Sequence, residues 1–341
     1  MSVRVGINGF GRIGRDYLRC VLERTSSGIE VVAINDVAAP ATLAHLLRYD
    51  STYGPLKAEV GHTDDTITVG GRTLRATAER DPAKLDWAGV GVDIVIESTG
   101  KFRTRETAGA HLIAGARKVI LSVPGKDVDT TVVLGVNEDS YDPAAHDVIS
   151  NASCTTNCVA PMVSVLHSAF GIERGLMTTI HSYTNDQVLL DSPHKDLRRG
   201  RSGATNLIPT STGAARAVGL VIPAMAGKID GVAVRVPVED GSLTDLSVEL
   251  SETVTVDQVN QAFADAAAGP LKGILRYTTD PIVSRDIIGD PASCVFDAQL
   301  TKADAHLAKV FGWYDNEWGY SCRLVDLVAK VAATLPAGVA A

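Results

Sequence analysis

One stretch near the start of the chain decides the fold: Val3-Arg4-Val5-Gly6-Ile7-Asn8-Gly9-Phe10-Gly11-Arg12-Ile13-Gly14. A short β-rich run leads into glycines spaced GxGxxG, and residues 15–23 then carry the apolar stripe of a helix. In a strand–turn–helix unit these glycines allow a tight turn, close approach of a pyrophosphate group and close packing of helix on strand. The stretch therefore predicts the first unit of a dinucleotide-binding sheet.

The next expected strand, residues 29–34, ends in Asn35-Asp36. A carboxylate at the end of this strand can accept hydrogen bonds from the adenosine ribose, and its charge repels the extra phosphate of NADP. Gly9, Gly11 and Asp36 together therefore predict an NAD site.

Strands and helices continue to alternate up to residue 150, which is typical of a parallel, doubly wound sheet. Such sheets bind ligands at the carboxyl ends of their strands, so Ser122 and the turn after Glu97 are candidate site positions. The later elements expected in this part are a helix at residues 104–114 and strands at residues 92–97, 118–122, 132–136 and 148–150.

A second informative stretch follows directly: Asn151-Ala152-Ser153-Cys154-Thr155-Thr156-Asn157-Cys158, and then the apolar residues 159–166. The pattern predicts a buried helix that begins near Cys154, with Pro161 bending or breaking it. The N–H groups and the positive dipole end of a helix N-terminus favour a thiolate and suit a bound oxyanion. Taken alone, Cys154 is more typical of a structural cysteine in a helix cap than of a nucleophile.

Beyond Cys154 the pattern changes to helices and mostly antiparallel strands. His181 lies in an expected strand at residues 176–183, and Arg235 lies in another at residues 231–238. Residues 184–206 form a long polar segment, which is unusual in a compact domain unless it has a function. This part of the chain is predicted to be an α+β domain.

The amino-acid composition and net charge limit the classes of molecule that the chain is expected to bind. The chain has 341 residues, a formal net charge of −8, 21% charged residues and five scattered cysteines. The negative charge argues against nucleic acid or an anionic membrane surface as the main partner. No cysteine pairing suggests zinc, no metal site is expected, and no apolar run is long enough to span a membrane. A reducing cytoplasm is the expected location.

Four motifs occur in a fixed order along the chain, and they support a more specific assignment. They are residues 7–14, Ala152-Ser153-Cys154-Thr155-Thr156-Asn157, His181-Ser182-Tyr183-Thr184 and Trp313-Tyr314-Asp315-Asn316-Glu317-Trp318-Gly319-Tyr320. With these motifs the sequence resembles the phosphorylating glyceraldehyde-3-phosphate dehydrogenases over essentially its whole length.

The resemblance implies a Rossmann-type, doubly wound parallel-sheet domain that binds NAD, formed by residues 1–151 and 319–341 because the C-terminal helix returns to it. It also implies an α+β catalytic domain with a mainly antiparallel sheet, residues 152–318. Members of the family are usually homotetramers, so a homotetramer is expected.

The implied reaction is oxidation and phosphorylation of D-glyceraldehyde 3-phosphate to 1,3-bisphosphoglycerate, with NAD and inorganic phosphate and through a cysteine thioester. Cys154 would be the nucleophile. His181 would be the base, and it would also support the thiolate.

The resemblance also implies two sets of binding residues. The residues expected to bind substrate and phosphate are Ser153, Thr155, Thr184, Arg199, Thr212, Gly213 and Arg235. The residues expected to bind the cofactor are Gly9, Gly11, Arg12, Ile13, Asp36, Arg80, Ser122 and Asn316.

Two other interpretations stay open at this point. Erythrose-4-phosphate dehydrogenase is a close relative that releases an acid rather than an acyl phosphate. A duplicate kept for binding, with little or no catalysis, is the other interpretation, although such a protein has no need to retain Cys154, His181, Arg235 and Asn316 together.

Overall fold

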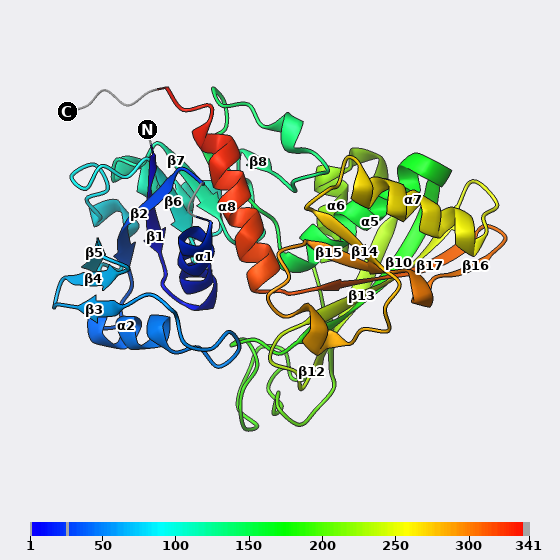
Figure 1. Cartoon of the computed structure of the whole chain (residues 1–341), viewed down its shortest axis with the longest axis horizontal. Helices are drawn as coiled ribbons and strands as arrows, with labels where there is room; N and C mark the ends of the chain where they lie inside the picture. The colour runs from blue at the N-terminus through cyan, green and yellow to red at the C-terminus, as the bar shows by residue number, and fades with distance from the viewer. Residues whose placement is uncertain (1, 25–26, 337–341) are drawn as a thin grey trace. The chain divides into compact units, whose positions relative to one another are not determined.

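The structure, a computed structural model, describes residues 2–24 and 27–336. The chain divides into two compact units, whose elements are labelled in Figure 1. Unit 1 comprises the described residues of Met1–Val132, Asp139–Ala152 and Ser321–Ala341, and unit 2 comprises Val133–Glu138 and Ser153–Tyr320. Each unit is built on its own sheet.

The sheet of unit 1 is parallel except at one edge, where β3 and β4 each pair antiparallel with the next strand. This arrangement confirms the predicted doubly wound α/β class. In sheet order, the described strands are β3 (Val60–His62), β4 (Thr66–Val69), β5 (Arg72–Thr77), β2 (Ile29–Asn35), β1 (Val3–Asn8), β6 (Ile94–Glu97), β7 (Lys118–Leu121), β9 (Val148–Ser150) and β8 (Thr130–Thr131).

The C-terminal helix α8 (Trp318–Ala332) contacts α1 (Arg12–Glu23) through its unit 1 residues. The Sγ atoms of Cys20 and Cys322 lie 3.6 Å apart, and Arg24 pairs with Asp326 at 2.7 Å. The end of the chain is therefore held on the first helix of the fold. The remaining helices of unit 1 are α2 (Pro40–Arg48), α3 (Arg105–Ala108) and α4 (Ala110–Ile113), with 3₁₀ turns at Pro82–Lys84 and Glu138–Ser140.

Close packing at the glycine turn explains two of the motif's glycines. Gly9 has a φ of +92°, and a Cβ there would lie 2.6 Å from the backbone nitrogen of Thr99. A Cβ at Gly14 would lie 2.3 Å from the carbonyl oxygen of Gly9. Larger residues at these positions would push the turn off β6 and α1 off the turn.

Two expectations for the residues that precede Cys154 were wrong. The helix expected at residues 104–114 is divided at Gly109 into α3 and α4, since a glycine between two short turns supports a continuous helix poorly. The strand expected at residues 132–136 is a turn, in which Gly135 has a φ of +81° and the side chain of Asn137 accepts a hydrogen bond from the Val133 N–H. Val132 and Val133 are fully buried, so burial accounts for the apolar residues that suggested a strand here.

The sheet of unit 2 is mainly antiparallel, as predicted for the second domain. Only the pairs β10–β12 and β14–β15 are parallel among the described strands. In sheet order, these strands are β11 (Ile208–Ser211), β12 (Ile229–Val236), β10 (Ile172–Ser182), β13 (Ser242–Leu250), β17 (Leu307–Tyr314), β15 (Cys294–Asp297) and β14 (Leu275–Thr278), with β16 (Lys302–Asp304) paired to β17.

Helices α5 (Cys154–Phe170), α6 (Ala214–Val221) and α7 (Val256–Ala268) pack on this sheet (Figure 1). Stacked rings of Phe263 and Phe296, with centroids 3.8 Å apart, join α7 to β15. Helix α5 is not broken at Pro161, because the buried apolar side chains on both sides of the proline keep it packed in the core. Short 3₁₀ turns lie at Pro223–Met225, Ser284–Ile287 and Ala298–Leu300. Among the described helices of either unit, none is both long enough and apolar enough to span a bilayer.

Candidate active site

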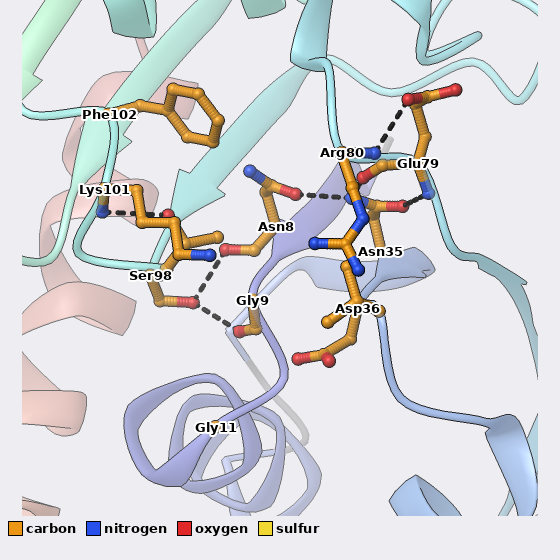
Figure 2. Close-up of a pocket in the computed structure, with 12 residues that line it drawn as sticks. Asn8, Gly9, Gly11, Asn35, Asp36, Glu79, Arg80, Ser98, Lys101 and Phe102 are labelled. Carbon is orange, nitrogen blue, oxygen red and sulfur yellow. Dashed lines mark hydrogen bonds between the residues drawn. The ribbon is translucent and has the colours of Figure 1, made fainter. Parts of the chain in front are cut away.

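Unit 1 contains a cavity of about 250 Å³ at the carboxyl ends of its central strands (Figure 2). Its wall is formed by the glycine turn, the end of β2, the segment after β5 and the turn after β6. The lining residues are Asn8, Gly9, Gly11, Asn35, Asp36, Val37, Glu79, Arg80, Ser98, Thr99, Lys101 and Phe102. This is the position at which open α/β sheets bind their ligands.

Asp36 is held firmly at the edge of this cavity. One carboxylate oxygen accepts a hydrogen bond from the Phe10 N–H at 2.8 Å, and the other accepts one from the Ala38 N–H at 3.0 Å. Figure 2 shows Arg80 and Asp36 on the same wall of the cavity. A carboxylate fixed in this way keeps further lone pairs for the hydroxyls of a ribose.

The glycine turn fits a pyrophosphate group. Gly11 lines the cavity, and a Cβ placed on it would meet no described atom within 4 Å. Gly11 is also the N-cap of α1 and makes no side-chain capping hydrogen bond. Space and backbone N–H groups therefore coincide at a helix N-terminus, which is the arrangement that binds phosphates.

Four of the predicted cofactor residues line this cavity, namely Gly9, Gly11, Asp36 and Arg80. Arg12 and Ile13 lie in the first turn of α1, where Arg12 forms ion pairs with Asp50 and Asp16. Ser122 is buried just after β7. The structure does not place these three side chains in the cavity wall, and their contacts with the cofactor remain predictions.

Several residues that line the cavity were not among the predicted cofactor residues. Asn8 and Asn35 end neighbouring strands, and the Asn35 Nδ2 donates to the Asn8 Oδ1 at 2.7 Å. Ser98 donates to the carbonyl oxygen of Gly9 at 2.6 Å and so ties the turn after β6 to the glycine turn. The available signal was position alone, because each of these residues lies at the carboxyl end of a strand.

The second cluster lies in unit 2, at the N-terminus of α5. Ser153 is the N-cap, and its Oγ accepts a hydrogen bond from the Thr156 N–H at 3.0 Å. All five cysteines lie in the described part of the chain, where four are buried and Cys154 is partly exposed. The predicted nucleophile is thus the cysteine that a substrate can reach, and it begins a helix.

Strand pairing brings His181 and Arg235 to Cys154. The parallel strands β10 and β12 place His181 directly beside Arg235. The His181 Nε2 lies 3.5 Å from the Cys154 Sγ, and the Nη1 of Arg235 lies 2.8 Å from the His181 Nδ1. The His181 Nδ1 also lies 2.8 Å from the carbonyl oxygen of Ser182, and a proton donated to that oxygen leaves Nε2 as the acceptor that faces the sulfur. These residues are far apart in the sequence but adjacent in the fold.

Burial changes the pKa values of both Cys154 and His181. Burial raises the pKa of the Cys154 thiol to about 11, while the charge of Arg235 acts in the opposite direction. Burial, together with Arg235, lowers the pKa of His181 to about 3. Since each change in pKa disfavours a lone charge, a thiolate and an imidazolium arise together, by passage of the thiol proton from Sγ to Nε2.

Thr155 is held on the other side of the cysteine. Its Oγ1 and the Oγ1 of Thr179 both lie 2.8 Å from the hydroxyl of Tyr314, which is buried at the end of β17. The ring of Tyr314 meets His181 edge to face, with centroids 5.9 Å apart. These contacts fix the first turn of α5 against the strands that carry the histidine.

The candidate anion-binding residues of unit 2 lie on three neighbouring segments. Arg199 donates through Nε to the Thr210 Oγ1 at 2.8 Å and forms an ion pair with Asp186. Both Arg199 and Asp186 lie close enough to Arg235 to influence its pKa, which burial lowers. The two arginines are therefore candidates for the positive charge that a bound anion requires, and this role remains a prediction.

The other predicted anion contacts are placed as follows. The Thr212 Oγ1 accepts a hydrogen bond from the Ala214 N–H at 3.1 Å, and Gly213 is the N-cap of α6. The Thr184 N–H donates to the Gln187 Oε1 at 2.8 Å. Asn316, which is predicted to bind the cofactor rather than an anion, follows β17 and is buried in unit 2. Whether these residues bind a ligand remains a prediction.

Comparison with known proteins agrees over both units. Residues 3–105 match the family model described as glyceraldehyde 3-phosphate dehydrogenase, NAD binding domain, and residues 153–316 match that of the C-terminal domain. The chain is 61% identical over 337 residues to a protein of Streptomyces coelicolor named glyceraldehyde-3-phosphate dehydrogenase, covering 98% of this chain and 100% of that one. It is 57% identical over 340 residues, with the same coverage, to the protein of that name from Mycobacterium tuberculosis.

Proposed function

Because the chain belongs to the glyceraldehyde-3-phosphate dehydrogenase family, we propose that it oxidises and phosphorylates D-glyceraldehyde 3-phosphate to 1,3-bisphosphoglycerate. The observation that carries the proposal is the 3.5 Å approach of the His181 Nε2 to the Cys154 Sγ at the N-terminus of α5. Unit 1 would bind the cofactor, and unit 2 would supply the catalytic groups. Neither alternative interpretation is favoured, since the relatives compared above carry the glyceraldehyde-3-phosphate dehydrogenase name.

The first step uses the cysteine–histidine pair. The thiol proton passes from the Cys154 Sγ to the His181 Nε2 as the sulfur adds to the aldehyde carbon, and His181 then gives this proton to the new hemithioacetal oxygen. His181, neutral again, then removes the proton from that oxygen as the carbon loses its hydride, and a thioester on Cys154 results. NAD, when bound, supplies the acceptor for this hydride.

The second step breaks the thioester. An oxygen of inorganic phosphate attacks the carbonyl carbon, the C–S bond breaks, and Cys154 leaves as a thiolate that is reprotonated. The substrate phosphate and the attacking phosphate both need hydrogen-bond donors. The proposed donors are Arg199, Arg235, the hydroxyls of Ser153, Thr155, Thr184 and Thr212, and the N–H of Gly213. Arg235 contacts His181 directly, through Nη1 and the His181 Nδ1.

NAD is the proposed cofactor. Support comes from the family model of the NAD binding domain and from the cavity at the glycine turn. Asp36 lines the cavity and offers a fixed carboxylate where NADP would carry an extra phosphate, so NAD is favoured.

We also propose a homotetramer in the cytoplasm. One face of the unit 2 sheet presents apolar side chains outward, with Leu176 68% exposed and Val232 50% exposed on the adjacent strands β10 and β12. A second copy of the chain is a suitable cover for such a face. A reducing compartment is required because Cys154 must stay a thiol to act as nucleophile.

The direct test measures NADH formation from glyceraldehyde 3-phosphate and NAD, with and without inorganic phosphate. We expect sustained turnover only when phosphate is present. Sustained turnover that is indifferent to phosphate would instead indicate hydrolysis of the thioester, as in an erythrose-4-phosphate dehydrogenase. A folded protein that binds NAD but gives no NADH would indicate a binding protein.

A further inference from the structure

Two cysteine thiols lie against each other where the first and last helices of the chain meet (Figure 1). Cys20 lies on α1 and Cys322 on α8, and each residue is 1% exposed. Their Sγ atoms are 3.6 Å apart, although the residues are 302 positions apart in the sequence. Both residues belong to unit 1, and the proposed catalytic chemistry uses neither thiol.

An ion pair holds the two helices together one turn beyond the cysteines. Arg24, the C-cap of α1, pairs with Asp326 of α8 at 2.7 Å. Each partner lies four residues after its cysteine, so the thiol contact and the ion pair lie on the same face of each helix. Arg323 pairs with the same carboxylate at 2.6 Å. The helices are therefore in contact at two successive turns, which keeps the two sulfurs opposite each other.

The same ion pair places the thiols close to solvent. The side chains of Arg24 and Asp326 are 31% and 35% exposed, so the cysteines lie one helical turn below the surface. A small neutral oxidant has to pass only this layer of side chains to reach the sulfurs. A disulfide would require the sulfurs to approach each other by about 1.5 Å more.

The surrounding groups make the two thiols chemically unequal. The hydrogen bond from Cys20 lowers the pKa of Cys322, and the charges of Arg24 and Arg323 act in the same direction. Burial raises the pKa of Cys20 well above its usual value, and the hydrogen bond to Cys322 adds to this effect. Because the thiolate is the form that attacks an oxidant, Cys322 is the sulfur that reacts first.

We propose that Cys20 and Cys322 are a redox modification site, at which a peroxide forms a reversible disulfide between the first and last helices. The Cys322 thiolate takes one oxygen from hydrogen peroxide and becomes a sulfenic acid, while the other oxygen leaves as hydroxide and is protonated to water. The Cys20 sulfur then attacks the sulfenic sulfur and the S–O bond breaks. The hydroxyl group leaves as water with the Cys20 proton, so two thiols and one peroxide give one disulfide and two waters.

The disulfide would act on the stability of the whole chain. It would close a loop that contains most of the sequence, and a cross-link of this kind restricts the unfolded chain more strongly as the loop lengthens. In a reducing compartment such a bond is transient, because other thiols reverse it. The modification would therefore stabilise the fold while peroxide is present and disappear afterwards.

A second pair of neighbouring thiols provides a comparison inside the same chain. Cys158 of α5 and Cys294 of β15 form a hydrogen bond in the core of unit 2, where both are 0% exposed. That hydrogen bond, together with burial, raises the pKa of Cys294 well above its usual value. The Cys158 thiol also donates to the carbonyl oxygen of Gly312 at 3.6 Å. Since these contacts favour thiols over thiolates, we expect this pair to stay reduced.

Peptide mapping of the full-length wild type tests the proposal. The folded protein is treated with hydrogen peroxide, the remaining thiols are blocked with iodoacetamide in denaturant, and the digest is analysed without reduction. We expect a linked pair of peptides that contain Cys20 and Cys322, which dithiothreitol separates, and alkylated Cys158 and Cys294 in the same digest. Alkylated Cys20 and Cys322 after treatment would overturn the proposal. A disulfide between Cys158 and Cys294 that forms as fast would also overturn it.

Thermal unfolding measures the effect of the bond, in a Cys154→Ser background that excludes oxidation of the proposed nucleophile. Peroxide should raise the Tm of this variant by about 5 °C or more, and dithiothreitol should reverse the rise. Adding Cys20→Ala should abolish the rise, whereas Cys158→Ser, the matched control, should leave it intact. A rise that persists in Cys20→Ala, or a linked protein with an unchanged or lower Tm, would contradict the proposed role. Neither measurement involves substrate or NAD, so its failure would leave the proposed function standing.

Discussion

The glycine turn of unit 1 and the cysteine cluster of unit 2 are built in opposite ways. The glycine turn takes its shape from a continuous run of residues and from backbone geometry, with Gly9 packed on Thr99 and Gly11 open to the cavity. The cluster joins Cys154, His181 and Arg235 from three separate elements, through the pairing of β10 with β12 and the start of α5. A local site tolerates change in the rest of the fold, whereas an assembled site depends on strand register.

The largest effect is expected from removing the nucleophile. Cys154→Ser should lower kcat by about 10⁴-fold or more, because a serine hydroxyl is far less ionised than a thiol beside the same histidine. Cys158→Ser, one helical turn away in the core, is the matched control and should retain activity within about tenfold. Equal activity of Cys154→Ser and wild type in the coupled NADH assay would refute the assignment of Cys154.

The second prediction concerns the different roles of two glycines in the turn. Gly9 is needed for the backbone conformation, whereas Gly11 leaves space for a ligand. Gly9→Ala should lower the free energy of unfolding by about 2 kcal/mol or more, because its φ is positive and its Cβ would strike Thr99. Gly11→Ala should leave stability within about 0.5 kcal/mol, since its Cβ meets no described atom, yet it should weaken NAD binding by occupying the cavity.

Denaturant titration and NAD titration on both glycine variants decide the matter. If Gly11→Ala proves as destabilising as Gly9→Ala, then the turn has no reserved space for a ligand. If Gly11→Ala binds NAD like the wild type, the pyrophosphate lies elsewhere.

A third prediction concerns the charge next to the cluster. Arg235 lowers the pKa of Cys154 against the effect of burial, so Arg235→Gln should raise that pKa further. At a fixed pH below the pKa, less thiolate is then present, and alkylation by iodoacetamide should slow by about tenfold if the pKa of Cys154 rises by about 1. The rate is followed from neutral to alkaline pH, with Cys154→Ser used to subtract reaction at other thiols. A pH profile that moves to lower pH in Arg235→Gln would contradict this prediction.

The smallest effect is expected at Asp36. Asp36→Asn keeps an acceptor for the Phe10 N–H but removes the negative charge, so the ratio of NAD to NADP affinity should fall by about tenfold. The fold should be unaffected, as judged by thermal unfolding. An unchanged ratio would show that another feature of the cavity excludes NADP.

The difference between the two regions also explains how much the sequence reveals. The turn can be recognised because the spacing of its glycines carries the geometry, and Gly9, Gly11 and Asp36 all line the cavity as predicted. Asn8 and Phe102 were missed because their positions depend on which strands are neighbours, and no local pattern states that. The turn after Glu97, which contains Ser98, was predicted from its place at the carboxyl end of a strand. The prediction for residues 132–136 was wrong since burial and strand pairing favour the same apolar residues.

In unit 2 the resemblance to a known family pointed to Cys154 and His181, whereas physical patterns alone left a capping cysteine and a strand histidine. Only the three-dimensional structure shows that Arg235 reaches His181, through the parallel pairing of β10 with β12. The hydroxyls of Ser182 and Ser242 both donate hydrogen bonds to the Asn316 Oδ1. The sequence does not predict these contacts, because serines at strand ends are common and their convergence depends on strand register.

The proposed function depends above all on Cys154 carrying the substrate as a thioester. Mass spectrometry of the protein after mixing with glyceraldehyde 3-phosphate and NAD, without inorganic phosphate, can detect that intermediate. We expect a burst of NADH equal to the number of active sites, with an acyl group on the peptide that contains Cys154, and loss of that group when phosphate is added. NADH formation without an adduct on Cys154, or an adduct that phosphate does not release, would contradict the thioester mechanism.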